Sequence, residues 1–321
     1  MIESSEISNE HEELFHDENH EEGYQVIEED LAKKEGNYIF TVGNVSSGKS
    51  TLQNLLIYRL WSKENIIFDY GNNTNDHRQR AIINRWVDSF KQGILPQRTQ
   101  QGVIQEFNIE IGQKGKQKLD VSFLEISGED IKSIVPSYDF DRKPSVHNFL
   151  DRYLMSENGI NKRFIFVSDG EKHKKGIVAN VNNESEDILF DAFLRYLLGE
   201  TQKGLKEINI LFVVSKWDTV REDYKNNFEK YMKRNFPQTL GILNGSRVTV
   251  MYLPFTVGKI DEKLIDKEKD IYEHRITTLE NSHIDRLIQW VYYTFTGETL
   301  KEFPPIKPSL LYRIAKMLRI R

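Results

Sequence analysis

The residue types most suited to chemistry stand between positions 43 and 51, where the chain reads GNVSSGKST. Four residues separate Gly43 from Gly48, and Lys49 and Ser50 follow, which matches the phosphate-binding pattern G-x-x-x-x-G-K-[ST]. Neither glycine carries a Cβ, so the backbone can turn sharply and approach an anion closely. In such a loop the amides face a phosphate, the lysine reaches the β- and γ-phosphates and the hydroxyl holds Mg²⁺. We therefore predict a nucleotide phosphate site made of Gly43, Asn44, Val45, Ser46, Ser47, Gly48, Lys49, Ser50 and Thr51.

The residues on either side of this loop have the pattern that a phosphate loop requires. Residues 38–42 form an apolar run typical of a strand, and four leucines recur at helical spacing from position 52 to position 60. A glycine-rich turn with a chance lysine would need neither element. The strand, loop and helix together therefore favour phosphate binding.

Two further polar runs follow apolar runs that are typical of strands. The first is Glu125-Ile126-Ser127-Gly128 and the second is Ser215-Lys216-Trp217-Asp218. A carboxylate such as that of Asp218 can accept hydrogen bonds from the N1–H and 2-amino groups of guanine, and adenine lacks both donors. A different interpretation makes Glu125 an edge-strand carboxylate and Asp218 a helix cap.

The hydrophobic pattern predicts alternating helices and strands from residue 37 to residue 298. Residues 107–111 and 119–123 alternate as two half-buried strands do, and we expect them to form an antiparallel hairpin. The other expected strands are 164–167, 208–214 and 248–253, and the other expected helices are 76–92, 146–155, 188–198, 224–232 and 284–295. This order predicts a three-layer α/β domain with a mostly parallel sheet, one antiparallel hairpin strand and a helical insertion after the first helix. The polar residues 172–176 are expected to form a loop, and the charged residues 259–280 an exposed loop or helix.

The composition excludes several classes of protein. The chain has 321 residues and no cysteine, so disulfides and thiolate metal sites are excluded. It has no apolar run long enough to span a bilayer, and the acidic N-terminus has no apolar signal core. We therefore expect a cytoplasmic protein. The net charge of −5 argues against a general nucleic-acid binder.

The two ends of the chain carry opposite charges. Residues 1–36 contain thirteen Asp or Glu and two Lys, a composition typical of a disordered arm. Alternatives for this tail are a docking arm for a basic partner or a weak metal site that uses His11, His16 and His20. Residues 299–321 are expected to be a separate basic segment, because residues 306–321 contain five Lys or Arg and no acid. They suggest an amphipathic helix that docks on a partner, on anionic lipid or on the acidic tail, or that simply packs on the domain.

With these motifs in place, the chain resembles the Ras-like, translation-factor-related GTPases, often called the TRAFAC class. The resemblance covers about residues 37–297 and implies a P-loop NTPase fold (G-domain). The family patterns are D-x-x-G and N-K-x-D, and this chain has Glu125 and Ser215 in place of the first residues. The resemblance implies that Glu125 contacts Mg²⁺ through water and that the Gly128 amide meets the γ-phosphate. It also implies that Ser215, Lys216 and Asp218 contact guanine.

The same resemblance assigns roles to residues in three other loops. It places Thr256 and Val257 in a short loop whose amides touch the base. It gives Thr99 the place of the first switch threonine, which joins Mg²⁺ and the γ-phosphate in the triphosphate state. Glu129 stands where the family often has a glutamine that orients water. Arg98 could act as an arginine finger in cis, and the alternative is a solvated surface arginine.

A looser resemblance connects the chain to bacterial GTPases of the double-GTPase type, which are often associated with conflict or defence systems. The resemblances imply that the chain binds Mg²⁺ and hydrolyses GTP to GDP and phosphate, slowly without a partner, as a switch for a protein effector or a multi-subunit assembly. A P-loop ATPase and a nucleotide-bound scaffold without hydrolysis are the alternatives. A homodimer is left open, no signal points to nucleic acid, and membrane contact is expected only through the C-terminal segment.

Overall fold

The computed structural model describes residues 35–70, 77–95, 105–126, 154, 160–174, 186–199, 208–245, 247–266 and 271–305. Several predictions lie outside these residues. They are the acidic tail up to residue 34, the C-terminal segment from residue 306, the helix at 146–155 apart from Leu154, and the roles of Arg98, Thr99, Gly128 and Glu129.

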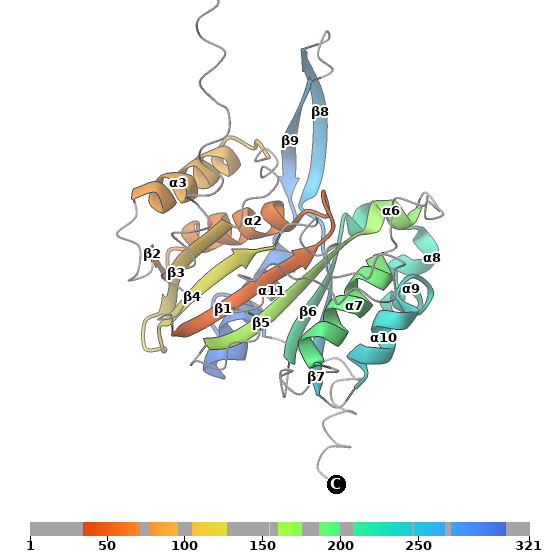
Figure 1. Cartoon of the computed structure of the whole chain (residues 1–321). Coiled ribbons are helices and arrows are strands. Elements are labelled where there is room, and N and C mark those ends of the chain that lie inside the picture. The colour runs from red at the N-terminus through yellow and green to blue at the C-terminus, as the bar shows by residue number, and fades with distance from the viewer. Residues whose placement is uncertain are drawn as a thin grey trace, which may run out of the picture. The chain divides into compact units, whose positions relative to one another are not determined.

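The domain is organised around a seven-stranded sheet with the order β2-β3-β4-β1-β5-β6-β7 (Figure 1). Its central part is parallel and consists of β4 (Leu119–Glu125), β1 (Gly36–Gly43), β5 (Ile160–Asp169), β6 (Ile208–Ser215) and β7 (Val248–Pro254). The strand β3 (Gln105–Gln113) runs antiparallel to both of its neighbours, β4 and the edge strand β2 (Ile66–Tyr70). The predicted mostly parallel sheet with one antiparallel strand is confirmed.

Three helices cover one face of the sheet over a mainly aliphatic core. They are α2 (Lys49–Trp61), α3 (His77–Lys91) and α11 (Asn281–Thr296). Residues of these helices share one buried cluster with Ile39, Ile165 and Val213 of the parallel strands. The last helix ends at Gly297, whose φ of 71° is in the left-handed region that favours glycine.

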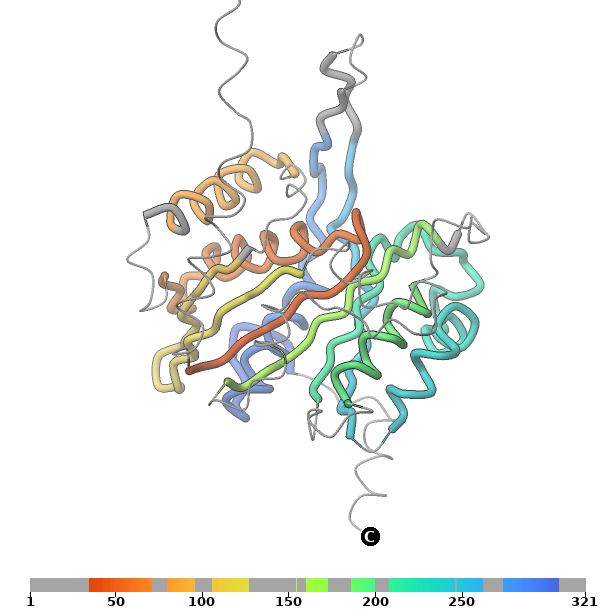
Figure 2. Tube along the Cα trace, viewed as in Figure 1, coloured from red at the N-terminus to blue at the C-terminus, as the bar shows by residue number. Residues whose placement is uncertain are grey.

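The opposite face of the sheet packs through phenylalanines against α7 (Glu186–Leu198), α9 (Phe228–Asn235) and α10 (Pro237–Leu243). The ring centroid of Phe190 lies 5.2 Å from that of Phe166 and 5.6 Å from that of Phe212. The central strands are therefore buried on both faces, which explains their nearly continuous apolar sequences. Figure 2 shows the chain path through these layers.

Most of the charged segment 259–280 forms strands, at residues 259–266 and 271–279, so the expected exposed loop or helix is wrong there. β8 (Gly258–Asp266) and β9 (Ile271–Leu279) make a separate antiparallel sheet. The backbone of β9 also bonds to residues that follow α3: Ile276 N donates to the Gly93 carbonyl at 2.7 Å, and Leu95 N donates to the His274 carbonyl at 3.2 Å. Hydrogen bonds to these residues, which are distant in the sequence, stabilise strands in a segment whose polar composition favours a loop.

Three smaller differences concern short elements. The expected helix at 224–232 is divided into α8 (Glu222–Lys225) and α9, because the Asn227 side chain accepts a hydrogen bond from Lys230 N and begins a new helix. The expected loop at 172–176 is in part the helix α6 (Gly170–Lys174). The strand β2 and the helix α10 were not expected. None of the described helices has the length and hydrophobicity needed to cross a membrane.

Candidate functional site

The phosphate loop connects the end of β1 to the start of α2. Gly43 has no room for a side chain, because an added Cβ would lie 2.3 Å from the Val167 carbonyl oxygen. Gly48 has a φ of 91° and directly precedes the helix. A side chain at Gly43 would therefore clash with β5, and a residue other than glycine at Gly48 would be strained by the positive φ. The N-cap residue Gly48 supplies no side-chain cap, and the uncapped first amides of a helix are suited to an anion.

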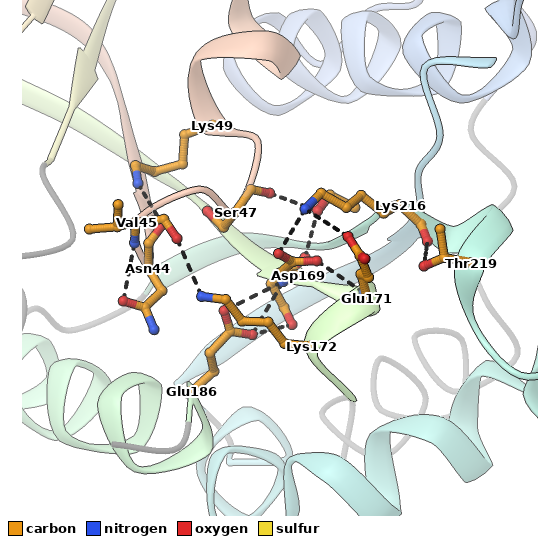
Figure 3. Close-up of polar contacts among 12 residues, drawn as sticks. Asn44, Val45, Ser47, Lys49, Asp169, Glu171, Lys172, Glu186, Lys216 and Thr219 are labelled. Carbon is orange, nitrogen blue, oxygen red and sulfur yellow. Dashed lines mark hydrogen bonds and ion pairs between the residues drawn. The ribbon is translucent and has the colours of Figure 1, made fainter. Parts of the chain in front are cut away.

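The Lys49 side chain folds back onto the loop. Its Nζ donates to the carbonyl oxygens of Gly43 at 2.9 Å and of Asn44 at 3.0 Å, as Figure 3 shows for Asn44. Burial lowers the pKa of Lys49, and the charges of Glu125 and Glu186 act in the opposite direction. Among the described residues its hydrogen bonds go to neutral carbonyls, so the buried ammonium is suited to an incoming anion.

Ser50 and Glu125 meet beside the lysine. The Ser50 hydroxyl lies 3.0 Å from Oε1 and 2.9 Å from Oε2 of Glu125, at the carboxyl end of β4. Burial raises the pKa of Glu125, whereas Lys49 and the Ser50 hydrogen bond act to lower it. The longer arm of glutamate, compared with aspartate, thus still reaches the serine hydroxyl of the loop.

These oxygen atoms are of the kind that Mg²⁺ prefers. In the part of the chain that the structure describes, no group of three His, Cys, Asp or Glu side chains could hold a metal ion. A magnesium ion at Ser50 and Glu125 would therefore take its remaining ligands from water and from nucleotide phosphates, as is usual for this ion.

Ser215 connects the end of β6 to the phosphate loop. Its hydroxyl lies 2.7 Å from the Ser47 carbonyl oxygen and 2.9 Å from that of Ser168. Because the hydroxyl has only one proton, it donates to these two buried acceptors in alternation or shares it between them. Ser215 therefore fixes the loop in place, a positioning role that comes in addition to the predicted contact with the ligand.

Lys216 is held by two carboxylates. It has a φ of 51°, and its Nζ lies 2.9 Å from Asp169 Oδ2 and 3.5 Å from Glu171 Oε2 (Figure 3). The side chain of Asp169 is only 4% exposed. This ion pair restrains the lysine stem at the mouth of the site.

Trp217 and Asp218 have opposite environments within the short helix η1 (Trp217–Thr219). Trp217 is buried against Phe228 and Tyr231, and its amide donates to the Phe255 carbonyl at 3.0 Å. Asp218 is exposed, and no hydrogen bond or ion pair within the described residues engages its carboxylate. The buried indole therefore anchors the turn while Asp218 is left accessible to a ligand.

The loop after β7 presents a single backbone donor. Thr256 N donates to His283 Nδ1 at 3.3 Å, and Gly258 N donates to the Thr256 hydroxyl at 3.3 Å. Of the three amides from 256 to 258, only that of Val257 has no partner among the described residues. Burial lowers the pKa of His283, which favours the neutral ring that can accept the Thr256 proton.

All of these groups gather at one edge of the sheet. The parallel strands β1, β4, β5, β6 and β7 end there, at Gly43, Glu125, Asp169, Ser215 and Pro254. Ligands of open α/β sheets bind beyond the carboxyl ends of the strands, where the strand order reverses. In this sheet the order reverses beside β1, because the chain proceeds from β1 to one side as far as β4 and then crosses to β5 on the other.

A comparison with protein families gives a match to the model described as Double-GTPase 1, over residues 40–270. The chain belongs to the Double-GTPase 1 family. The match includes the phosphate loop, Glu125 and the run from Ser215 to Asp218. Family membership and the G-domain fold together support GTP binding and hydrolysis by this double-GTPase. No curated protein matches its sequence.

Solved structures resemble this double-GTPase distantly. The signal recognition particle receptor SRb-GTP/SRX complex from Chaetomium thermophilum is 11% identical, with a TM-score of 0.38 over 70% of this chain and 91% of that one. The S. cerevisiae Ski7 GTPase-like domain is 12% identical, with a TM-score of 0.36 over 71% of this chain and 45% of that one. The small COPII coat GTPase SAR1 from Encephalitozoon cuniculi is 12% identical, with a TM-score of 0.32 over 88% and 92% of the two chains. The double-GTPase chain thus spans less than half of the Ski7 chain.

Sequence reasoning missed four polar residues of this site. Asp169 and Glu171 hold Lys216, His283 holds the Thr256 amide, and Lys172 Nζ donates to the Val45 carbonyl at 3.3 Å. Asp169 had a detectable signal, since it is a charged residue at the end of a buried strand next to the phosphate-loop strand. The other three become visible only when the positions of α6 and α11 are known.

Proposed function

We propose that this double-GTPase binds GTP with Mg²⁺, hydrolyses it to GDP and phosphate, and changes a surface for a protein partner with its nucleotide state. The contact of the Ser215 hydroxyl with the Ser47 carbonyl, at 2.7 Å, carries the proposal. It joins the phosphate loop to the run that ends at Asp218. A single nucleotide bound there could therefore contact the phosphate loop with its phosphates and the run that ends at Asp218 with its base.

Base selection rests on two groups of opposite polarity. The exposed Asp218 carboxylate would accept from the N1–H and 2-amino groups of guanine. The Val257 amide would donate to guanine O6, where adenine instead carries an amino donor. Adenine would therefore leave both groups unmatched, a mismatch that can discriminate by orders of magnitude.

The phosphate end rests on Lys49, Ser50 and Glu125. Lys49 would exchange its two carbonyl acceptors for phosphate oxygens. Ser50 and Glu125 would hold Mg²⁺, which neutralises charge on the β- and γ-phosphates when it is bound. The Gly128 amide, Thr99, Arg98 and Glu129 stay predictions for the γ-phosphate side.

A continuous backbone connection supports the switch. Val257 is followed directly by β8, which pairs with β9, and β9 bonds to Gly93 and Leu95. Those residues lead into the segment in which Thr99 is expected to meet the γ-phosphate. The base loop and the first switch segment are thus connected through the β8–β9 hairpin. The partner, the association with a conflict or defence system and the cytoplasmic location stay predictions.

The first test is to purify the protein natively and identify its bound nucleotide by chromatography. A mixture of GDP and GTP is expected, and ADP or ATP alone would favour the P-loop ATPase. Phosphate release measured over hours, with Lys49→Ala as the control, then tests hydrolysis. Bound GTP without any release of phosphate would leave the nucleotide-bound scaffold as the function.

A further inference from the structure

A second lysine reaches the phosphate loop from the short helix that follows β5. Lys172 lies in α6, which begins directly after β5, and its Nζ donates to the Val45 carbonyl oxygen at 3.3 Å (Figure 3). Val45 is the third residue of the loop that begins at Gly43 and is next to Asn44, whose carbonyl binds Lys49. Two ammonium groups therefore border the same short stretch of backbone.

The charges of these lysines act on each other. The Lys49 ammonium donates to the Gly43 and Asn44 carbonyls, and the Lys172 ammonium donates to the adjoining Val45 carbonyl, so both positive charges lie against three consecutive residues. The buried carboxylates of Glu125 and Glu186 are each engaged by other groups. Glu125 accepts from the Ser50 hydroxyl at 2.9 Å, and Glu186 accepts from the Ser168 hydroxyl at 2.6 Å and from Asp169 N at 3.2 Å. Two neighbouring cations are unfavourable without an anion between them, so this arrangement suits a highly charged ligand such as a triphosphate.

The backbone that carries Lys172 is tightly held. A Cβ on Gly170 would lie 2.7 Å from the Ser215 carbonyl oxygen and 2.8 Å from Val220 Cγ2. Glu171 N donates to Asp169 Oδ1 at 3.0 Å, and the other oxygen of that carboxylate binds Lys216. The contacts that hold the base-reading turn therefore also fix the start of α6 against the phosphate loop.

The bond of Lys172 itself is weak. Charge-assisted hydrogen bonds of an ammonium group are typically about 2.7–2.9 Å long, whereas this one is 3.3 Å and ends on a neutral carbonyl. Within the described residues it is the one bond that Nζ makes. A phosphate oxygen, which carries a formal charge, would be a stronger acceptor at the same place.

We propose that Lys172 is a catalytic residue that leaves the Val45 carbonyl for a γ-phosphate oxygen and stabilises the charge of the transition state. This inference rests on the proposed GTP hydrolysis and assigns to α6 a cationic role separate from that of Arg98. In the reaction, a water oxygen bonds to the γ-phosphorus, and the bond from that phosphorus to the β–γ bridging oxygen breaks. The bridging oxygen leaves with the electron pair as part of GDP. The water loses a proton, so the products are GDP, hydrogen phosphate and H⁺.

The test uses the full chain with Lys172→Ala, Lys172→Gln and Lys172→Arg. Lys118→Ala is the matched control, because it removes the same charge from the amino end of β4, away from the site. Lys118 pairs there with Glu110 at 2.6 Å. Single-turnover hydrolysis of GTP, the Kd for GDP and the Kd for the complex of GDP with aluminium fluoride are measured for each variant.

Removal of a charge that acts in the transition state should slow hydrolysis by about 10- to 100-fold. Binding of the aluminium fluoride complex should weaken by a similar factor, the Kd for GDP should change less than about twofold, and Lys172→Arg should restore part of the rate. If Lys172 had a purely structural role, its substitution would weaken the binding of GDP and of the aluminium fluoride complex equally, and that result would overturn the proposal. Hydrolysis at the wild-type rate by Lys172→Ala would also overturn it. A wild-type chain that binds GTP and releases no phosphate would overturn both this role and the proposed hydrolysis.

Discussion

The Ser215→Ala substitution tests whether the base-reading strand holds the phosphate loop. The change removes one hydroxyl that lies 2.7 Å from the Ser47 carbonyl and 2.9 Å from the Ser168 carbonyl, and it keeps the Cβ. Ser215 is only 4% exposed, so water cannot readily replace the lost donor. A buried polar group left without a partner costs about 1–3 kcal/mol. If half to all of that cost, about 0.5–3 kcal/mol, falls on the nucleotide-bound state, affinity for both GDP and GTP should fall by about 2- to 160-fold.

The assay is calorimetric titration of GDP and of a non-hydrolysable GTP analogue, combined with denaturant unfolding of the ligand-free protein. Ser62→Ala is the matched control, because it removes the same kind of hydrogen bond, from the Ser62 hydroxyl to the Arg59 carbonyl at 2.9 Å, at an exposed helix end. The control should change stability by less than about 0.5 kcal/mol and leave affinity unchanged. If Ser215→Ala matched this control in both measurements, the reasoning that Ser215 fixes the loop would be refuted.

Three other substitutions test the base site and the hairpin. Asp218→Asn replaces one acceptor oxygen by an amide donor, so affinity for GTP should fall at least about 100-fold while affinity for xanthosine triphosphate, which has an oxygen in place of the 2-amino group, should rise in competition assays. The pKa of His283 is lowered by burial, so the stability from its neutral form is fully present above about pH 6.5 and is lost as the pH falls through the lower folded value. His283→Gln should flatten the pH dependence of the unfolding midpoint below about pH 6.5. Gly258 has a φ of 127° and an added Cβ would lie 1.9 Å from the Thr278 carbonyl, so Gly258→Ala should destabilise by about 1–3 kcal/mol or more in denaturant titration, whereas Gly241→Ala, in a helix with open space around it, should not.

Much of the central domain could be predicted because its strands and helices are strongly patterned. The continuous apolar runs at β1, β5 and β6 predict strands buried on both faces. The loop from Gly43 to Ser50 matches the pattern G-x-x-x-x-G-K-[ST], which few structures other than phosphate loops require. The alternation at β3 and β4 predicts their antiparallel pairing, which the register of Phe107 with Phe123 confirms. These signals are local, so they can be read without knowledge of the fold.

Other features depend on contacts between distant parts of the chain. The pairing of β9 with Gly93 and Leu95 makes strands of a segment whose charged composition favours a loop. Lys172 and His283 resemble ordinary surface residues until α6 and α11 place them beside Val45 and Thr256. A single sequence contains no local pattern for such contacts, because the same residue types occur on any solvated helix.

The position of β1 also has a consequence for how the chain acquires its structure. β1 lies between β4 and β5, and its residue Asn37 pairs with Asn161, 124 positions further along the chain. A nascent polypeptide that has emerged only as far as β4 therefore exposes one unpaired side of β1, which is a surface prone to wrong association. The loop that begins at Gly43 obtains its neighbours Val167 and Ser215 still later in synthesis. Slow pairing between distant strands is typical of such topologies, so a ribosome-bound fragment that ends before β6 should be unable to retain nucleotide.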